Sequence, residues 1–159
     1  DDTLVTGASH VQRDPSLVWS VSGRRILHEL AEPESGCSFL EVSSSGGRIV
    51  TAGLVSDIFV WNANGQLEIA LPARASFPVG VVISADGSTL AHTRAHEAFL
   101  WDIPGHRMRT VVNAELRITA LGLLSSRLVT FVDGAATVWD AGTGELVRHL
   151  DGSGGRCHH

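Results

Sequence analysis

Four side chains capable of chemistry stand in one short stretch of the sequence: His92, Arg94, His96 and Glu97. Imidazole and carboxylate groups bind zinc, but a metal site needs several of them to converge on one point. The i, i+4 spacing of the two histidines achieves that on a helix, whereas the residues around them predict a strand and a hairpin. We therefore expect no metal here. The favoured interpretation is a solvated loop that offers an arginine for contact with another protein.

A second stretch, Val5-Thr6-Gly7-Ala8-Ser9, resembles the opening of a short-chain dehydrogenase. In that family a Gly-rich turn after a strand brings backbone amides close to a pyrophosphate. Here no further glycine and no helical pattern follow, and the family's catalytic Tyr and Lys are excluded because the chain contains neither residue type. We interpret the stretch as an ordinary strand and expect no cofactor.

The composition argues against several other classes of protein. The net charge is −5 and no basic cluster stands out, whereas a nucleic-acid partner requires concentrated Lys and Arg. No apolar run reaches the roughly 18 residues of a membrane span. No serine or cysteine has a recognisable catalytic partner, and no two carboxylates stand at a spacing typical of glycosidases. We therefore expect a protein that is not an enzyme.

The two cysteines and the end of the chain carry little information. Cys37 and Cys157 share no motif. Two free thiols in a reducing, cytoplasmic compartment is the favoured interpretation, and a single disulfide is the alternative. Residues 152–159 are small and polar and predict a flexible tail, whose final pair of histidines leaves a tag remnant open as an explanation.

The tryptophans recur at a nearly constant interval, which indicates an internal repeat. They are Trp19, Trp61, Trp101 and Trp139, separated by 42, 40 and 38 residues. Each closes a short apolar run and is followed within a few residues by a glycine. The runs are four to seven residues long and rich in β-branched residues, and turn residues such as Asp86-Gly87 divide them, so each repeat predicts four strands joined by hairpins. No stretch keeps a helical period, and the chain is predicted to be all-β.

This pattern resembles the WD-repeat β-propeller family. Trp101-Asp102 and Trp139-Asp140 match the dipeptide that names the family, while Trp61-Asn62 and Trp19-Ser20 are degenerate copies. The resemblance implies four-stranded antiparallel blades, with strands a to d running outward from the axis and each Trp a structural residue at the end of strand c. The family's Gly-His pair before strand a is absent. We therefore expect the blades to be held mainly by apolar packing, without the family's buried polar network.

The repeats divide residues 1–151 into a partial propeller of about 15 antiparallel strands. The predicted blades are residues 3–31, 37–72, 77–113 and 117–151, and the first lacks strand a, so the ring is incomplete. Four blades with apolar ends predict a segment of a larger propeller. It would be completed by flanking sequence, by a second copy that brings the total to about eight blades, or by a different subunit.

The resemblance implies a protein–protein interaction scaffold, with partners that are other protein subunits or the rest of its own propeller. Two alternatives stay open: the sensor region of a larger signalling protein (a nucleotide-binding switch or a kinase), and an enzyme with its site in the axial channel. We define the contact face as the side carrying the d–a and b–c loops. Its candidate residues are Arg13, Asp14, Glu32, Glu34, Asp57, Arg74, Arg94, His96, Asn113 and Glu115.

Overall fold

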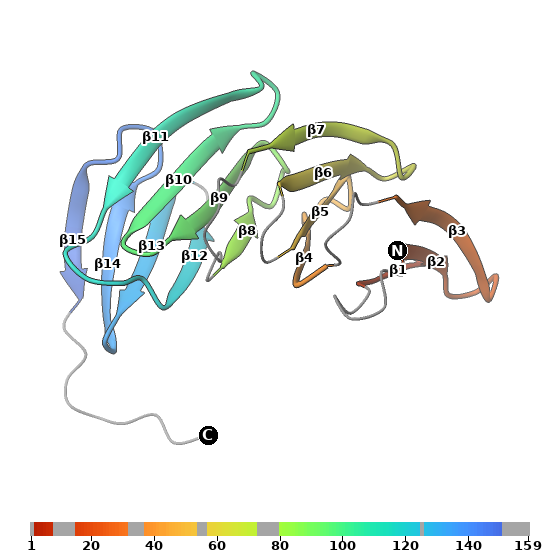
Figure 1. The fold of residues 1–159 in the computed structure, drawn as a ribbon, viewed down its shortest axis with the longest axis horizontal. Coiled ribbons are helices and arrows are strands. Elements are labelled where there is room, and N and C mark those ends of the chain that lie inside the picture. Colours follow the sequence, from red (N-terminus) through yellow and green to blue (C-terminus); the bar gives the residue numbers. More distant parts are fainter. Residues whose placement is uncertain are drawn as a thin grey trace.

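The chain folds into four antiparallel sheets that follow one another along an arc (Figure 1). The computed structural model describes residues 2–7, 15–31, 37–53, 57–72, 80–124 and 126–150. These residues form 15 strands and no helix. The prediction of an all-β fold of about 15 antiparallel strands is therefore confirmed, while the predicted tail at 152–159 lies outside the described residues.

Each blade is one sheet whose strands pair in chain order. Blade one holds β1 (Thr3–Thr6), β2 (Ser16–Ser20) and β3 (Arg25–Leu30). Blade two holds β4 (Phe39–Val42), β5 (Arg48–Ala52), β6 (Ile58–Asn62) and β7 (Leu67–Leu71). Blade three holds β8 (Val81–Ile83), β9 (Thr89–Arg94), β10 (Glu97–Asp102) and β11 (Arg107–Asn113). Blade four holds β12 (Ala120–Leu124), β13 (Arg127–Val132), β14 (Ala135–Asp140) and β15 (Leu146–Leu150).

Strand a of blade four begins two residues later than its apolar pattern predicts. The pattern places the start at Ile118, but the amide of Ile118 donates to the carbonyl of Ala95, 2.9 Å away, in the neighbouring blade. The regular ladder with β13 begins only at Ala120, which pairs with Phe131. Ile118 is nevertheless fully buried, so its hydrophobicity reflects packing between blades rather than a place in the strand.

The hydrophobic core lies between the blades, because side chains alternate along each strand toward the two neighbouring sheets. In β6, Phe59 and Trp61 pack toward blade one, while Ile58 and Val60 pack toward blade three. A third cluster joins blades three and four around Leu100. Stability thus comes from stacking one sheet on the next, as in other repeat proteins.

The a–b turns of blades two and three have the same construction, as their similar sequences predict. In blade three the Thr89 amide donates to Ser84 Oγ at 2.9 Å, and Ser84 Oγ donates to Asp86 at 2.6 Å. Three hydrogen bonds to Ser84 and Ser88 lower the pKa of Asp86 to about 2. In blade two Ser45 replaces the aspartate, and its amide donates to the carbonyl of Ala85 at 2.9 Å, which links the two turns.

A β-bulge that the sequence did not predict precedes every tryptophan. The pairing of strands c and d shifts register just before Trp19, Trp61, Trp101 and Trp139. An extra residue on one strand increases the local twist and redirects the side chain next to it. The repeat of the bulge in all four blades keeps the indoles in equivalent positions.

Candidate protein-interaction surfaces

The structure describes half of the ten candidate contact residues. Asp57, Arg94, His96, Asn113 and Glu115 lie in described segments, whereas the other five lie outside them: Arg13, Asp14, Glu32, Glu34 and Arg74. Asp57 is exposed and precedes β6 in the b–c connection of blade two.

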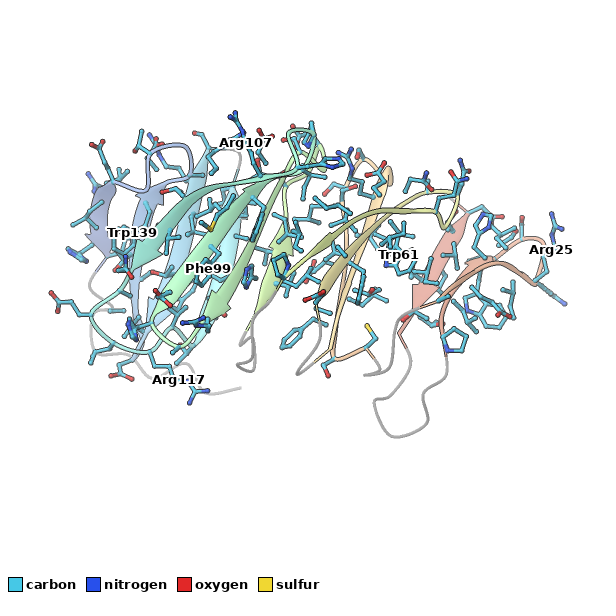
Figure 2. The ribbon with its side chains drawn as sticks, turned by 45° about the horizontal axis from the view of Figure 1, so that its top comes forward. Arg25, Trp61, Phe99, Arg107, Arg117 and Trp139 are labelled. Atoms are coloured by element: carbon cyan, nitrogen blue, oxygen red, sulfur yellow. The ribbon has the colours of Figure 1, made fainter. Side chains whose placement is uncertain are left out.

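Backbone hydrogen bonds bring together the other four described candidates, Arg94, His96, Asn113 and Glu115, at the contact face of blade three. Glu97 pairs with Asn113 across β10 and β11, and the Ala114 amide donates to the carbonyl of His96 at 2.8 Å. This contact holds the b–c hairpin against the d–a crossover that carries Glu115. Figure 2 shows Arg117, on the same crossover, at the opposite edge of the array from Arg107, the first residue of β11.

The Arg94 side chain makes contacts that a fully solvated loop residue would lack. Its guanidinium lies 3.5 Å from the Glu97 carboxylate and 5.9 Å from the centroid of the Phe99 ring. The next residue, Ala95, has a φ of 54°, a left-handed conformation that costs a non-glycine residue about 1–3 kcal/mol. The hairpin therefore presents a fixed, half-buried arginine beside the exposed His96.

The two histidines of this stretch do not converge. His92 belongs to β9 and is 4% exposed, whereas His96 lies in the exposed turn. The His92 ring stacks on Phe99 with centroids 5.0 Å apart, and burial lowers its pKa to about 4. In the part of the chain that the structure describes, no three His, Cys, Asp or Glu side chains gather as metal ligands would.

Three of the four tryptophans make a polar link that the sequence did not predict. The indole Nε1 atoms of Trp19, Trp61 and Trp139 donate to Thr6, Thr51 and Thr130 at 3.0, 2.9 and 2.9 Å. These links add a polar contact to blades that the sequence predicts to be held mainly by apolar packing. The signal was present as a threonine on strand b, two residues beyond the one that pairs with the Trp. Thr6 also lies in the dehydrogenase-like stretch. There it belongs to β1, which pairs with β2 as an ordinary antiparallel strand.

In blades two and four the residue after the Trp organises the c–d turn. Asp140 accepts hydrogen bonds from the amides of Gly142 and Thr143 at 2.9 and 3.0 Å, and these bonds lower the pKa of Asp140. Asn62 serves blade two in the same way. In blade one, where Ser20 follows the Trp, the carboxylate of Asp2 accepts from the amide of Ser22 at 2.7 Å. The recurring dipeptide thus joins a core residue to a turn residue.

The outward sheet faces of the two end blades are apolar. On blade one the alternation that buries Val18 leaves Trp19 on the opposite face, with Leu4 across the sheet at 52% exposure. On blade four the alternation that buries Leu128 leaves Phe131 on the opposite face at 39% exposure. Each end therefore offers one side of the kind of interface found between inner blades.

Blade one also has an open edge where strand a stands in the other blades. Within the described residues β1 pairs only with β2, whereas β5, β9 and β13 each pair on both sides. A hollow of about 480 Å³ lies beside β1, lined by Leu4, Val5 and the turn around Ser44. Such an edge is a template for a further strand.

The described inner strands carry a single ionisable residue, Glu41 in β4, and burial raises its pKa. Cys37 is partly buried, with its Sγ atom 3.1 Å from the carbonyl of Phe39, and Cys157 lies outside the described residues. No described segment forms a helix long and apolar enough to cross a membrane.

Solved structures resemble this fold, although no protein-family model and no curated protein matches the chain. The computationally designed Ika8 protein is similar with a TM-score of 0.79 and 24% identity, over 96% of this chain and 47% of that chain. A chain of a Mitotic Checkpoint Complex is similar with a TM-score of 0.78 and 17% identity, over 96% and 48%. The present chain spans about half the length of both. At these identities the likeness shows the fold alone, an array of propeller-like blades.

Proposed function

We propose that this chain is a non-enzymatic, cytoplasmic protein-interaction scaffold of the WD-repeat type and forms part of a larger propeller. The observation that carries the proposal is the complementarity of its two ends. Every inner interface joins the Trp-bearing face of one blade to the far face of the blade before it. Blade one exposes a Trp-bearing face and blade four a far face, so further blades fit at either end.

The similar structures support a ring longer than four blades, since both chains are about twice as long. The Mitotic Checkpoint Complex is, by its name, an assembly of several proteins, which supports protein partners for the present chain. The rigid blades would hold the loops of the contact face in a fixed arrangement, and such loops on a stiff scaffold commonly carry binding specificity.

Light scattering and hydrogen exchange on the 159-residue chain test the completion of the ring. We expect self-association, or fast exchange of the Leu4–Thr6 amides relative to those of β9. The comparison is with β9 because β9 is a strand b with partners on both sides, whereas β8 is itself an edge strand. A monomer whose β1 amides exchange as slowly as those of β9 would overturn the proposal.

A charge on the far face of blade four provides the matched variant. Phe131→Asp introduces a carboxylate at an end face, and Val21→Asp introduces the same group at a 57% exposed site in a turn. We expect the first variant to abolish association with further blades and the second to leave it unchanged. Equal association of the two variants would show that the end faces do not form the interface.

A further inference from the structure

A groove of about 430 Å³ opens between blades three and four at the contact face. It is lined by Asn113 at the end of β11, by Glu115 from the crossover that follows, by Asp133 from the β13–β14 hairpin, and by Thr137 and Trp139 from β14. The indole of Trp139 is partly exposed and is held by the hydrogen bond of its Nε1 atom to Thr130. All four strands of both blades are present, so the groove does not depend on completion of the ring.

The groove has a simple origin in the sequence. The residue two positions before the repeated Trp is Leu17, Phe59, Phe99 and Thr137 in the four blades. The Phe59 and Trp61 ring centroids lie 6.1 Å apart, and Phe99 stacks on His92. Figure 2 labels Trp61 and Phe99. Blade four has a small threonine at this place, which leaves space beside Trp139.

The charged groups that line the groove favour a cation. Glu115 and Asp133 are its acidic residues, and neither forms an ion pair with any residue that the structure describes. Among the described lining residues the one basic side chain is His149, whose Nδ1 atom lies 3.1 Å from Thr137 Oγ1; no arginine lines the groove, and the chain contains no lysine. The aromatic face of Trp139 adds an attraction for a cation.

Two exposed leucines extend the groove with apolar surface. Leu116 is 57% exposed and Leu146 is 49% exposed, and they lie on the crossover and on β15 respectively. In an extended peptide, residues two positions apart project to the same side. A basic residue and an apolar residue at that spacing can therefore face the groove together.

We propose that the groove binds an extended peptide segment of a partner protein, with an arginine or lysine near Glu115 and Asp133 and an apolar residue two positions away against Leu116 or Leu146. This inference rests on the proposed scaffold role and names the chemistry of one partner. The basic side chain lies against the indole of Trp139, and Asn113 is available to the peptide backbone.

An array of capped nonapeptides tests the charge requirement with the full chain. Each peptide carries a central Arg, Gln or Glu and an apolar residue two positions to either side, and binding is measured by titration calorimetry. We expect the Arg peptides to bind about tenfold or more tightly than their Gln counterparts, and the Glu peptides not to bind. Equal binding of the three sets, or no binding by any of them, would overturn the proposal.

Matched variants test the location. Glu115→Gln with Asp133→Asn removes the acidic pair and is expected to weaken Arg peptides about tenfold or more. Glu29→Gln with Glu145→Gln changes the net charge equally, at exposed sites outside the groove, and is expected to leave binding unchanged. If both double variants lose affinity equally, the effect is general electrostatics and the groove is not the site.

Thr137→Phe gives blade four the aromatic residue of blades two and three and fills the groove. We expect loss of Arg-peptide binding with a melting temperature no lower than that of the parent chain. A folded Thr137→Phe variant that binds normally would place the site elsewhere. The peptide-binding results are independent of whether the ring is completed. Hydrogen exchange at β1 and self-association report on blade one and on the far face of blade four. The peptide-binding proposal can therefore be overturned while ring completion is supported, and ring completion can be overturned while peptide binding is supported.

Discussion

His92 and Trp101 stack on neighbouring strands of blade three, with ring centroids 6.4 Å apart and ring planes inclined by 20°. His92 occupies the register at which the other blades carry the threonine that accepts from the Trp. His92 Nε2 and Trp101 Nε1 are both buried, and neither has a hydrogen-bond partner among the described residues. Blade three thus replaces a polar link with an aromatic stack.

This arrangement predicts a loss of stability in acid. Burial lowers the pKa of His92 from 6.5 to about 4, so between these values the unfolded chain binds a proton that the native chain does not. The contribution of His92 is complete above pH 6.5 and declines as the pH falls, by roughly 3 kcal/mol at pH 4. Urea denaturation at several pH values between 7.5 and 4 measures it.

Two variants identify the group responsible for that decline. His92→Thr removes the titrating ring and restores an acceptor for Trp101, so we expect a flatter stability profile between pH 6.5 and 4. His96→Gln removes an exposed imidazole and should keep the parent profile. An unchanged slope in His92→Thr would assign the acid sensitivity to other groups.

Loss of a single threonine that accepts a hydrogen bond from a Trp should lower the free energy of unfolding. Thr51→Val keeps the shape of the side chain but leaves the buried Nε1–H of Trp61 without an acceptor, and we expect a loss of about 1–3 kcal/mol in unfolding free energy. Thr3→Val, at an exposed position in β1, should change it by less than about 0.5 kcal/mol. Equal effects in chemical denaturation would contradict a structural role for the link.

The four tryptophans should differ in their contribution to stability. Trp61 is 4% exposed and packs in the interface of blades one and two, so Trp61→Ala is expected to cost roughly 3–5 kcal/mol. Trp19 lies half-buried on the outward face of blade one, and Trp19→Ala should cost clearly less. Thermal melts of the two variants under identical conditions make the comparison, and a larger loss for Trp19→Ala would refute it.

Charge reversal at Arg94 should affect partner binding more than folding. The ion pair with Glu97 is partly exposed, and such pairs contribute about 1 kcal/mol or less. Arg94→Glu is expected to lower capture of protein partners while the chain stays folded. Arg107→Glu breaks a comparable pair with Asp102 at the opposite end of the same blade and serves as the control. Equal partner recovery by both variants would reduce Arg94 to a structural role.

The blades could be predicted from the sequence because both of their signals are local. Trp spacing and short apolar runs depend on neighbouring residues, and β1 to β15 follow from them. The groove could not be predicted in this way, since Thr137 is informative only when aligned with Phe59 and Phe99 and placed beside Glu115 of another blade. The burial of His92 likewise depends on strand register, which sets it against Phe99 rather than beside His96.

The matching end faces have a consequence for growth of the assembly. An interface that joins unlike surfaces of identical units can repeat indefinitely, and it stops only where the rotation per unit closes on itself. Units that miss closure add to one another as an open filament. A protein that covers the Trp19 face without exposing a Trp-bearing face of its own would cap that end of the filament. The cellular concentration of that cap, rather than the affinity between blades alone, would then set the length of the array.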